Sequence, residues 1–143
     1  MHGKEPALTK QSETAISHHF SGQLYQSTAP FSHFVQQGYT GYTAGIIGQD
    51  PASGALVSAD VTAQCEAMLT NLETLLNELG LLIGDIIRTT VYLTDYQDFE
   101  AINAVYAQRL TPPFPARTTI QAAGLPLGAK VQIEATVHLP NMG

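Results

Sequence analysis

The spacing of apolar residues changes along this chain, and the change separates helix from sheet. Between Asp60 and Leu79 apolar residues recur every three or four positions, which predicts an amphipathic helix of about five turns that ends at Gly80. Over 129–139 they alternate with polar residues, the pattern of a strand with one face on the core. A chain with both patterns has to pack the apolar stripe of a helix against the apolar face of a sheet.

Other segments add strands and a second helix. Short aromatic and β-branched stretches predict a hairpin over 34–37 and 38–45, and a β-branched run predicts a strand over 85–93. Asp95 and Asp98 form a predicted helix start before a helix over about 96–110, which the following prolines end. A strand over 116–122 completes the order strand, strand, helix, strand, helix, strand, strand. Two helices on one face of a mixed sheet make the predicted fold class α+β.

The composition predicts one globular domain with its own core. The chain has 143 residues, of which 44% are apolar and 13% charged. Residues 1–20 are polar and without periodicity, so we expect an N-terminal arm there and the domain over 21–143. Neither a secretory signal nor an apolar run of about 20 residues is present, so we expect a cytoplasmic protein with no membrane partner.

The charged and metal-binding residue types exclude several functions. Six Lys and Arg against twelve Asp and Glu give a net charge of −6, and nucleic-acid affinity depends on basic residues, so no nucleic-acid partner is expected. The single Cys65 lies on the helix stripe and is expected to be a small buried residue. His18 and His19 are adjacent and no carboxylate completes a ligand set, so no metal is expected. No glycine-rich phosphate loop occurs, and no cofactor is expected.

One face of the predicted sheet is polar. If the other face packs on the helices, this face carries alternating residues of the last two strands: Arg117, Thr119, Gln121, Lys130, Gln132, Glu134 and Thr136. Such a face can simply meet water. The alternative is that it meets another copy of the chain, with a few charges directed at a ligand pocket between subunits.

Several short motifs follow one another in a fixed order. They are Ala-Pro-Phe-Ser-His at 29–33, Ala-Gly at 44–45, Asp-Pro-Ala-Ser-Gly at 50–54, Asn-Leu at 71–72, Thr-Thr-Val-Tyr-Leu-Thr-Asp at 89–95, Pro-Ala-Arg at 115–117 and Ile-Glu-Ala at 133–135. In order and spacing, over about residues 28–139, they resemble the Rid proteins, the reactive intermediate deaminases also called the YjgF-like family. The resemblance implies a chorismate-mutase-like fold, a homotrimer with its sheets around a central barrel, and ligand clefts between subunits.

The resemblance also gives roles to two charged residues. The planar guanidinium of an arginine matches a carboxylate with two hydrogen bonds, and the matching arginine in the family binds the substrate carboxylate, which implies this role for Arg117. A carboxylate at a cleft can orient or deprotonate water, and the family match implies that Glu134 positions the attacking water. Without the resemblance, an exposed arginine on a strand and a solvated glutamate would be the simpler interpretations.

Further residues are implied to shape the cleft. The main chain near Gly45 and the N–H of Thr119 would contact the ligand. Phe31 stands where the deaminating members have a tyrosine, which leaves an apolar wall without a hydroxyl. Ile46 stands where they have a glutamine and would make the floor less polar, and His33 replaces a common glutamine at the cleft rim.

The implied activity is cofactor-free hydrolysis of reactive 2-imino or 2-enamino acids to 2-oxo acids and ammonia. The alternative is a trimeric protein that binds small carboxylates such as 2-oxo acids without efficient deamination, an alternative that Phe31 and Ile46 favour. Ribonuclease or translation-inhibitor activity has been attached to some relatives, and the acidic balance of this chain argues against it.

Overall fold

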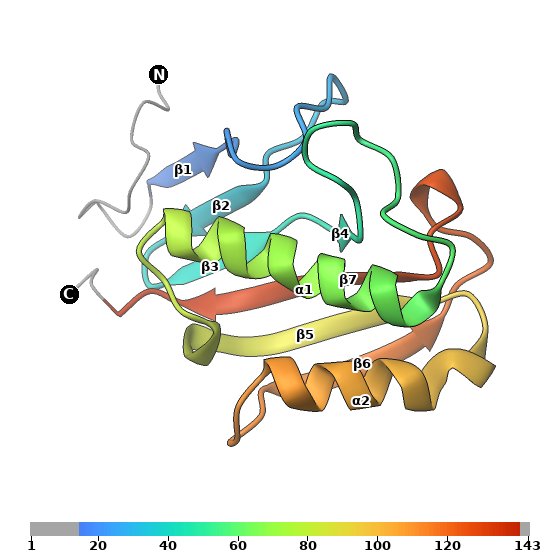
Figure 1. Ribbon diagram of the computed structural model, residues 1–143. Coiled ribbons are helices and arrows are strands. Elements are labelled where there is room, and N and C mark those ends of the chain that lie inside the picture. The colour runs from blue at the N-terminus through green and yellow to red at the C-terminus, as the bar shows by residue number, and fades with distance from the viewer. Residues whose placement is uncertain (1–14, 141–143) are drawn as a thin grey trace.

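Seven strands form a mixed sheet, and both helices lie on the same face of it (Figure 1). The computed structural model describes residues 15–140. The strand order is β1-β2-β3-β7-β5-β6, and the short β4 also pairs with β7; only β5 and β6 run parallel. The elements are β1 (Ile16–His19), β2 (Phe34–Gln37), β3 (Thr40–Thr43), β4 (Ile46–Ile47), α1 (Val61–Glu78), η1 (Ile83–Asp85), β5 (Ile86–Leu93), η2 (Tyr96–Asp98), α2 (Phe99–Arg109), β6 (Ala116–Gln121), η3 (Pro126–Gly128) and β7 (Val131–His138).

The α+β prediction is confirmed, and two strands are additional to it. β1 lies within the segment that was expected to be a polar arm, and it pairs antiparallel with β2 through Ile16 and Gln37. The rest of that predicted arm, residues 1–14, lies outside the described residues. β4 has only two residues, both buried, and pairs Ile46 with Ile133 of β7.

The first helix begins and ends as its sequence predicts. The Asp60 carboxylate accepts a hydrogen bond from the Ala63 N–H at 2.9 Å, and Gly80 follows the helix with a φ of 78° that favours glycine. The buried stripe of α1 packs on the sheet and supplies much of the core. Cys65 is fully buried on this stripe, and burial raises the pKa of its thiol to about 12. This thiol is therefore a core residue, as expected.

The second helix starts later than predicted. Asp95 accepts a hydrogen bond from the Gln97 N–H at 2.9 Å and so caps the 3-10 turn η2, while α2 begins at Phe99. α2 is joined to α1 by Arg109, whose guanidinium donates to the Glu66 carboxylate at 2.7 Å. Within the described residues, no helix is long and apolar enough to cross a bilayer.

The polar residues that were predicted to share one face of the sheet lie on both of its faces. β5 pairs Thr89 with Arg117 of β6 and Thr90 with Glu134 of β7. Successive side chains of a strand point to opposite faces, so Arg117 shares the helix-covered face with the buried Thr89, and Glu134 lies on the other face. The predicted polar face is therefore wrong for Arg117, Thr119 and Gln121 and holds for Gln132, Glu134 and Thr136. β6 alternates Ala116, Thr118 and Ile120 with a fully polar set, and this polar set lies on the helix-covered face, so the alternation of this edge strand gave the wrong orientation.

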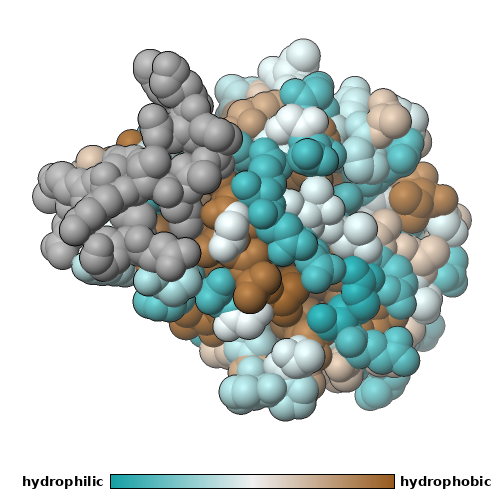
Figure 2. All heavy atoms as spheres, turned by 60° about the vertical axis from the view of Figure 1, so that its left-hand side comes forward, coloured by the Kyte–Doolittle hydropathy of each residue, from teal (hydrophilic) through white to brown (hydrophobic). Residues whose placement is uncertain are grey.

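The face that carries Glu134 is covered by neither α1 nor α2. The Arg88 guanidinium crosses part of it and donates to the Thr118 hydroxyl at 2.6 Å. Large apolar side chains are also exposed there, among them Tyr42 and Ile120 at 50% and 44% exposure. Apolar surface is visible among polar residues on the side of the molecule shown in Figure 2 as well. Exposed apolar surface of this kind is typical of an interaction surface.

Candidate functional site

Arg117 is held in place by side chains of α2. Its Nη2 donates to the Asn103 Oδ1 at 2.8 Å, and its guanidinium carbon lies 4.8 Å from the Tyr106 ring centre and 5.7 Å from that of Phe99. Stacking on aromatic rings stabilises a guanidinium that is partly removed from water. Among the described residues no carboxylate lies within ion-pair distance of this arginine. Its positive charge is thus fixed in position and has only neutral partners.

An open groove of about 320 Å³ runs beside this arginine, and we call it the Arg117 groove. Its lining comprises Asn103, Tyr106, Ala107, Phe114, Pro115 and Arg117. Sequence reasoning did not single out Asn103. Its position four residues after Phe99 and three before Tyr106 places it on the same face of the helix as those two rings, which was the available signal.

Thr119 lies on the same edge strand and presents its main chain outward. The Tyr96 hydroxyl donates to the Thr119 carbonyl at 3.0 Å, and the Ala122 N–H donates to the Leu93 carbonyl of β5. In a parallel pair alternate residues bond the neighbouring strand, so the Thr119 N–H, like its carbonyl, points away from β5. The geometry is compatible with the predicted role of this N–H as a ligand contact.

A second depression lies on the other side of the molecule, and we call it the Gly45 hollow. It has a volume of about 560 Å³ and contains no charged residue; it is lined by Tyr25, Ser27, Ala29, Phe31, Ala44, Gly45, Ile47, Gln49, Pro126, Leu127 and Gln132. Phe31 is exposed and contributes an apolar ring to this lining. Gly45 lies close to Gln132, because a Cβ on it would be 2.7 Å from the Gln132 side-chain amide, which would have to move.

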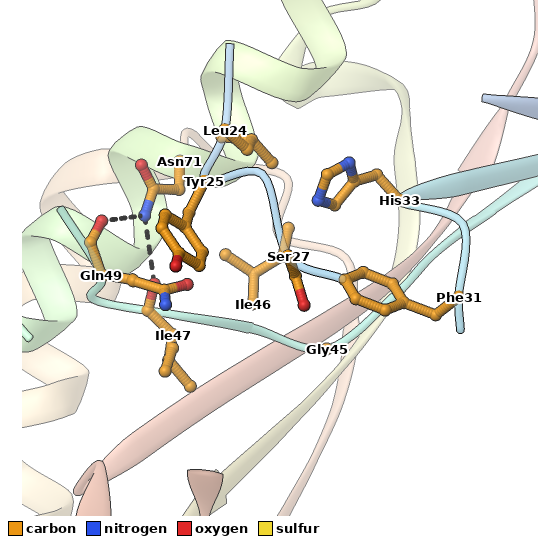
Figure 3. Close-up of a pocket in the computed structure, with 10 residues that line it drawn as sticks. All are labelled: Leu24, Tyr25, Ser27, Phe31, His33, Gly45, Ile46, Ile47, Gln49 and Asn71. Atoms are coloured by element: carbon orange, nitrogen blue, oxygen red, sulfur yellow. Dashed lines mark hydrogen bonds between the residues drawn. The ribbon is translucent and has the colours of Figure 1, made fainter. Parts of the chain in front are cut away.

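Ile46 was predicted to form the apolar floor of the cleft, but it is Ile47 that lines the Gly45 hollow. Ile46 is 6% exposed and belongs to the core, where it forms part of a smaller cavity beneath the hollow. Ile47 lines both the hollow and this cavity. The less polar floor expected from Ile46 is thus supplied to the hollow by its neighbour. Asn71 of α1 fixes this segment, because its amide donates to the carbonyls of Ile47 and Gln49 at 3.1 and 2.9 Å (Figure 3).

The smaller cavity has a volume of about 70 Å³, and we call it the His33 cavity (Figure 3). His33 is buried rather than at the rim, and its ring packs against those of Phe20 and Phe31, with centres 4.3 and 5.2 Å away. The Ser21 N–H donates to its Nδ1 at 2.8 Å. Burial, and then the charge of His19, lower the pKa of His33, and the Glu78 carboxylate opposes them weakly. His33 is therefore a neutral ring near neutral pH.

Glu134 is adjacent to the Gly45 hollow in the sheet. β4 pairs Ile46 with Ile133, and continuing this antiparallel register by one residue brings Gly45 opposite Glu134. Glu134 lines a polar depression of about 170 Å³ together with Thr43, Arg88 and Thr90. Burial raises the pKa of the Tyr92 phenol, and the negative charge of Glu134 raises it further, which places this carboxylate beside that ring.

The predicted site residues therefore form two groups. Phe31, Gly45 and Glu134 lie together, with Ile46 just beneath, whereas Arg117 and Thr119 lie at the far edge of the sheet on its helix-covered side. One chain cannot bring Arg117 and Glu134 to the same small ligand, because the sheet separates them. Over residues 15–140 no cluster of three metal-ligating side chains occurs.

Comparisons with known proteins agree with this architecture. The model of the family described as Endoribonuclease L-PSP matches residues 21–139. The 2-iminobutanoate/2-iminopropanoate deaminase of Capra hircus is 42% identical over 106 residues, which cover 74% of this chain and 77% of that protein. RidA from an Antarctic Psychrobacter superposes with a TM-score of 0.81 at 30% identity, covering 85% of this chain and 98% of that one. E. coli TdcF with bound serine gives a TM-score of 0.78 at 33% identity, with the same coverage.

Proposed function

The chain belongs to the Rid, or YjgF-like, family, and we propose from this that it is a cofactor-free hydrolytic deaminase of reactive 2-imino and 2-enamino acids. The proposal includes a cytoplasmic location and a homotrimeric assembly. Relatives that are 42% and 40% identical to this chain carry the name 2-iminobutanoate/2-iminopropanoate deaminase. A related chain of known structure holds serine, an amino acid with a free carboxylate.

The observation that carries the proposal is the state of Arg117. It is partly buried, stacked on Tyr106, fixed by Asn103 and without a carboxylate partner among the described residues. A guanidinium has five N–H donors, and among the bonds to residues 15–140 only one of those of Arg117 is used. The remaining donors suit the carboxylate of a 2-imino acid, which would supply the missing negative charge.

The assembly would complete the site. The Arg117 groove of one subunit, placed against the Gly45 hollow of a neighbour, would bring Arg117 and Glu134 to one ligand. The exposed Tyr42 and Ile120 on the uncovered sheet face support association of this kind, because their burial between copies is favourable. A homotrimer would contain three such composite sites.

The reaction is balanced with water as its one other reactant. A 2-enamino acid first gains a proton at C3 and loses one from its nitrogen, which makes it the 2-imino acid. Water then adds to C2, and the resulting carbinolamine loses ammonia as the C–N bond breaks, which leaves the C2 carbonyl of the 2-oxo acid. Arg117 would hold the carboxylate, and the Glu134 carboxylate would accept a proton from the attacking water and return it to the departing nitrogen. General acid–base help of this kind contributes about 10²–10⁴-fold.

Two other functions were considered for this chain. A trimeric protein that binds 2-oxo acids without efficient deamination is favoured by Phe31, whose ring offers the cleft no hydroxyl. The description of the family model names an endoribonuclease. We do not propose that activity, because six basic residues against twelve acidic ones provide little attraction for a phosphate backbone.

The experiment generates imines in situ and follows their loss. An amino-acid oxidase or a dehydratase supplies 2-iminopropionate or 2-aminoacrylate, and semicarbazide trapping reports the imine that remains. Addition of this protein is expected to lower the trapped imine and to speed formation of the 2-oxo acid. No acceleration with several precursors, together with retained binding of 2-oxo acids in calorimetry, would leave only the binding function.

A further inference from the structure

The His33 cavity adjoins the Gly45 hollow, and polar groups line it. The two share Tyr25, Ser27, Phe31, Gly45, Ile47 and Gln49 in their linings. With about 70 Å³, the cavity is large enough for one small polar group and much smaller than the hollow above it. Its position makes it a side pocket of the proposed site.

His33 offers an unused hydrogen-bond donor to this cavity. Because the Ser21 N–H donates to Nδ1 at 2.8 Å, the hydrogen of the neutral ring is on Nε2. The ring is 6% exposed, and its far nitrogen points toward the middle of the residues drawn in Figure 3. Within the described part of the chain this nitrogen has no partner. A buried N–H without an acceptor is unfavourable, so the position favours a ligand that supplies one.

Two other polar groups of the lining have free capacity. The Ser27 hydroxyl oxygen accepts from the Ala29 N–H at 3.1 Å, which leaves its own hydrogen available. The Gln49 side-chain nitrogen donates to the Gly54 carbonyl at 2.7 Å, which leaves its Oε1 available as an acceptor. Among residues 15–140, none that lines the cavity is charged. Together with the His33 N–H these groups provide two donors and one acceptor, all neutral, and the lining also includes the neutral polar side chains of Tyr25 and Asn71.

We propose that the His33 cavity receives the end of the substrate side chain and selects 2-imino acids whose side chain ends in a carboxamide. The carboxamide oxygen accepts from His33 and Ser27, and its NH₂ group donates to Gln49. A charged end would be buried against neutral groups only, which is costly, and an apolar end would leave the His33 N–H unpaired. This specificity rests on the proposed function, because the cavity opens beside Phe31 and Gly45 of that site.

Isosteric pairs of compounds test the proposal. Leucine matches asparagine in shape but has no carboxamide, and homoleucine matches glutamine in the same way. An amino-acid oxidase converts each to its 2-imino acid, and the rate of 2-oxo acid formation with this protein is measured for each. Calorimetry with 2-oxosuccinamate and 4-methyl-2-oxopentanoate gives the affinities of one product pair independently of turnover. We expect at least one carboxamide compound to be favoured over its isostere by about tenfold or more.

Variants of His33 and Ser27 connect that preference to the cavity. His33→Phe keeps an aromatic ring and removes the donor, so the preference is expected to fall to about one- to twofold. His33→Gln keeps both an acceptor for Ser21 and a donor for the cavity, and most of the preference should return. Ser27→Ala removes the second donor without changing the aromatic packing, so it should reduce the carboxamide preference. It serves as the test if His33→Phe does not fold.

The outcomes distinguish the proposed carboxamide specificity from the proposed deaminase function. Binding or turnover of 2-oxo and 2-imino acids with no carboxamide preference, or with a preference that His33→Phe and Ser27→Ala both leave intact, overturns the specificity and keeps the deaminase. A complete absence of 2-oxo acid binding and of imine hydrolysis overturns both.

Discussion

The Arg117 groove and the Gly45 hollow differ in the kind of recognition that each provides. The groove has a fixed positive charge, held by two aromatic rings and an amide, and it is shallow and open. The hollow is larger and shaped by backbone, apolar walls and neutral polar groups, and none of the described residues that line it is charged. Each region lacks what the other has, and the sheet lies between them. The comparison suggests that charge recognition and shape recognition are divided between faces that only assembly can bring together.

The largest effect is expected at Glu134, which lies in the sheet beside the hollow and would carry out the proposed chemistry. Glu134→Gln removes the proton acceptor and keeps the shape, so turnover of 2-iminopropionate should fall about 10²–10⁴-fold while 2-oxo acid affinity changes little. Steady-state rates and calorimetry measure the two effects. Glu100→Gln on the exposed side of α2 is the matched control for the loss of charge. Unchanged turnover in the Glu134 variant would remove this residue from the mechanism.

Arg117→Ala tests the groove. A charged hydrogen bond contributes about 1.5–3 kcal/mol, so 2-oxo acid affinity should fall by about 10–10²-fold or more, and turnover with it. Arg109→Ala removes the same charge but affects the ion pair with Glu66, so it should lower the Tm and leave ligand affinity intact. Equal affinities of the Arg117 variant and the unmodified protein would show that the groove binds no carboxylate.

Mixing the two inactive variants tests whether the regions act across subunits. If each site takes Arg117 from one chain and Glu134 from its neighbour, co-refolding equal amounts of Arg117→Ala and Glu134→Gln chains gives about a quarter of sites with both residues intact. Activity should rise about tenfold or more above that of either variant alone. Activity that only averages the two variants would place both residues of a site in one chain and contradict the proposed assembly.

A smaller effect is expected from Gly45→Ala. The added Cβ would lie 2.7 Å from the Gln132 amide, so this side chain has to move within the hollow. We expect a loss of severalfold, about 3–10-fold, in kcat/KM, with a folded protein, because the end of a flexible side chain can shift. Gly84→Ala, where no atom lies within 4 Å of the added carbon, is the control. An effect of the same size at Gly84 would attribute the loss to the backbone.

The smallest effect is expected in the pH dependence of the free energy of unfolding, to which the His33 ring contributes and Arg117 does not. The pKa of His33 is lowered in the folded chain by burial and by His19, against the weaker opposing effect of Glu78, from an ordinary value of 6.5. The unfolded chain therefore takes up a proton first, and stability is lost as the pH falls below about 6.5. Urea unfolding at pH 7.5 and 5.5 should show a larger loss for the unmodified protein than for His33→Gln. Arg117 keeps its charge over this range, so the groove adds no such dependence. Identical losses in both proteins would contradict this role of His33.

The sequence predicts best the elements that have one apolar and one polar side. α1 and β7 have strong periodicity and were found within about two residues of their ends. β6 has its polar side on the helix-covered face and Ile120 on the other, so its orientation follows from the parallel register with β5 and not from its own alternation. For the same reason Arg117 was expected beside Glu134, although the sheet separates them. The buried position of His33 depends on packing between distant segments, which no local pattern reveals, whereas the helical spacing of Asn103 from Phe99 and Tyr106 was a local signal that was not used.

The hydrogen bond from the Tyr96 hydroxyl to the Thr119 carbonyl has a further consequence for solubility. β6 is the last strand of the sheet, and a free edge can add strands from other molecules without limit. Tyr96 occupies one outward carbonyl of this edge and also donates its own N–H to the Gln121 side chain at 3.0 Å. Together with the charge of Arg117, these bonds make the edge a poor template for another strand. The edge that carries the proposed carboxylate contact is thus also protected against fibrous aggregation.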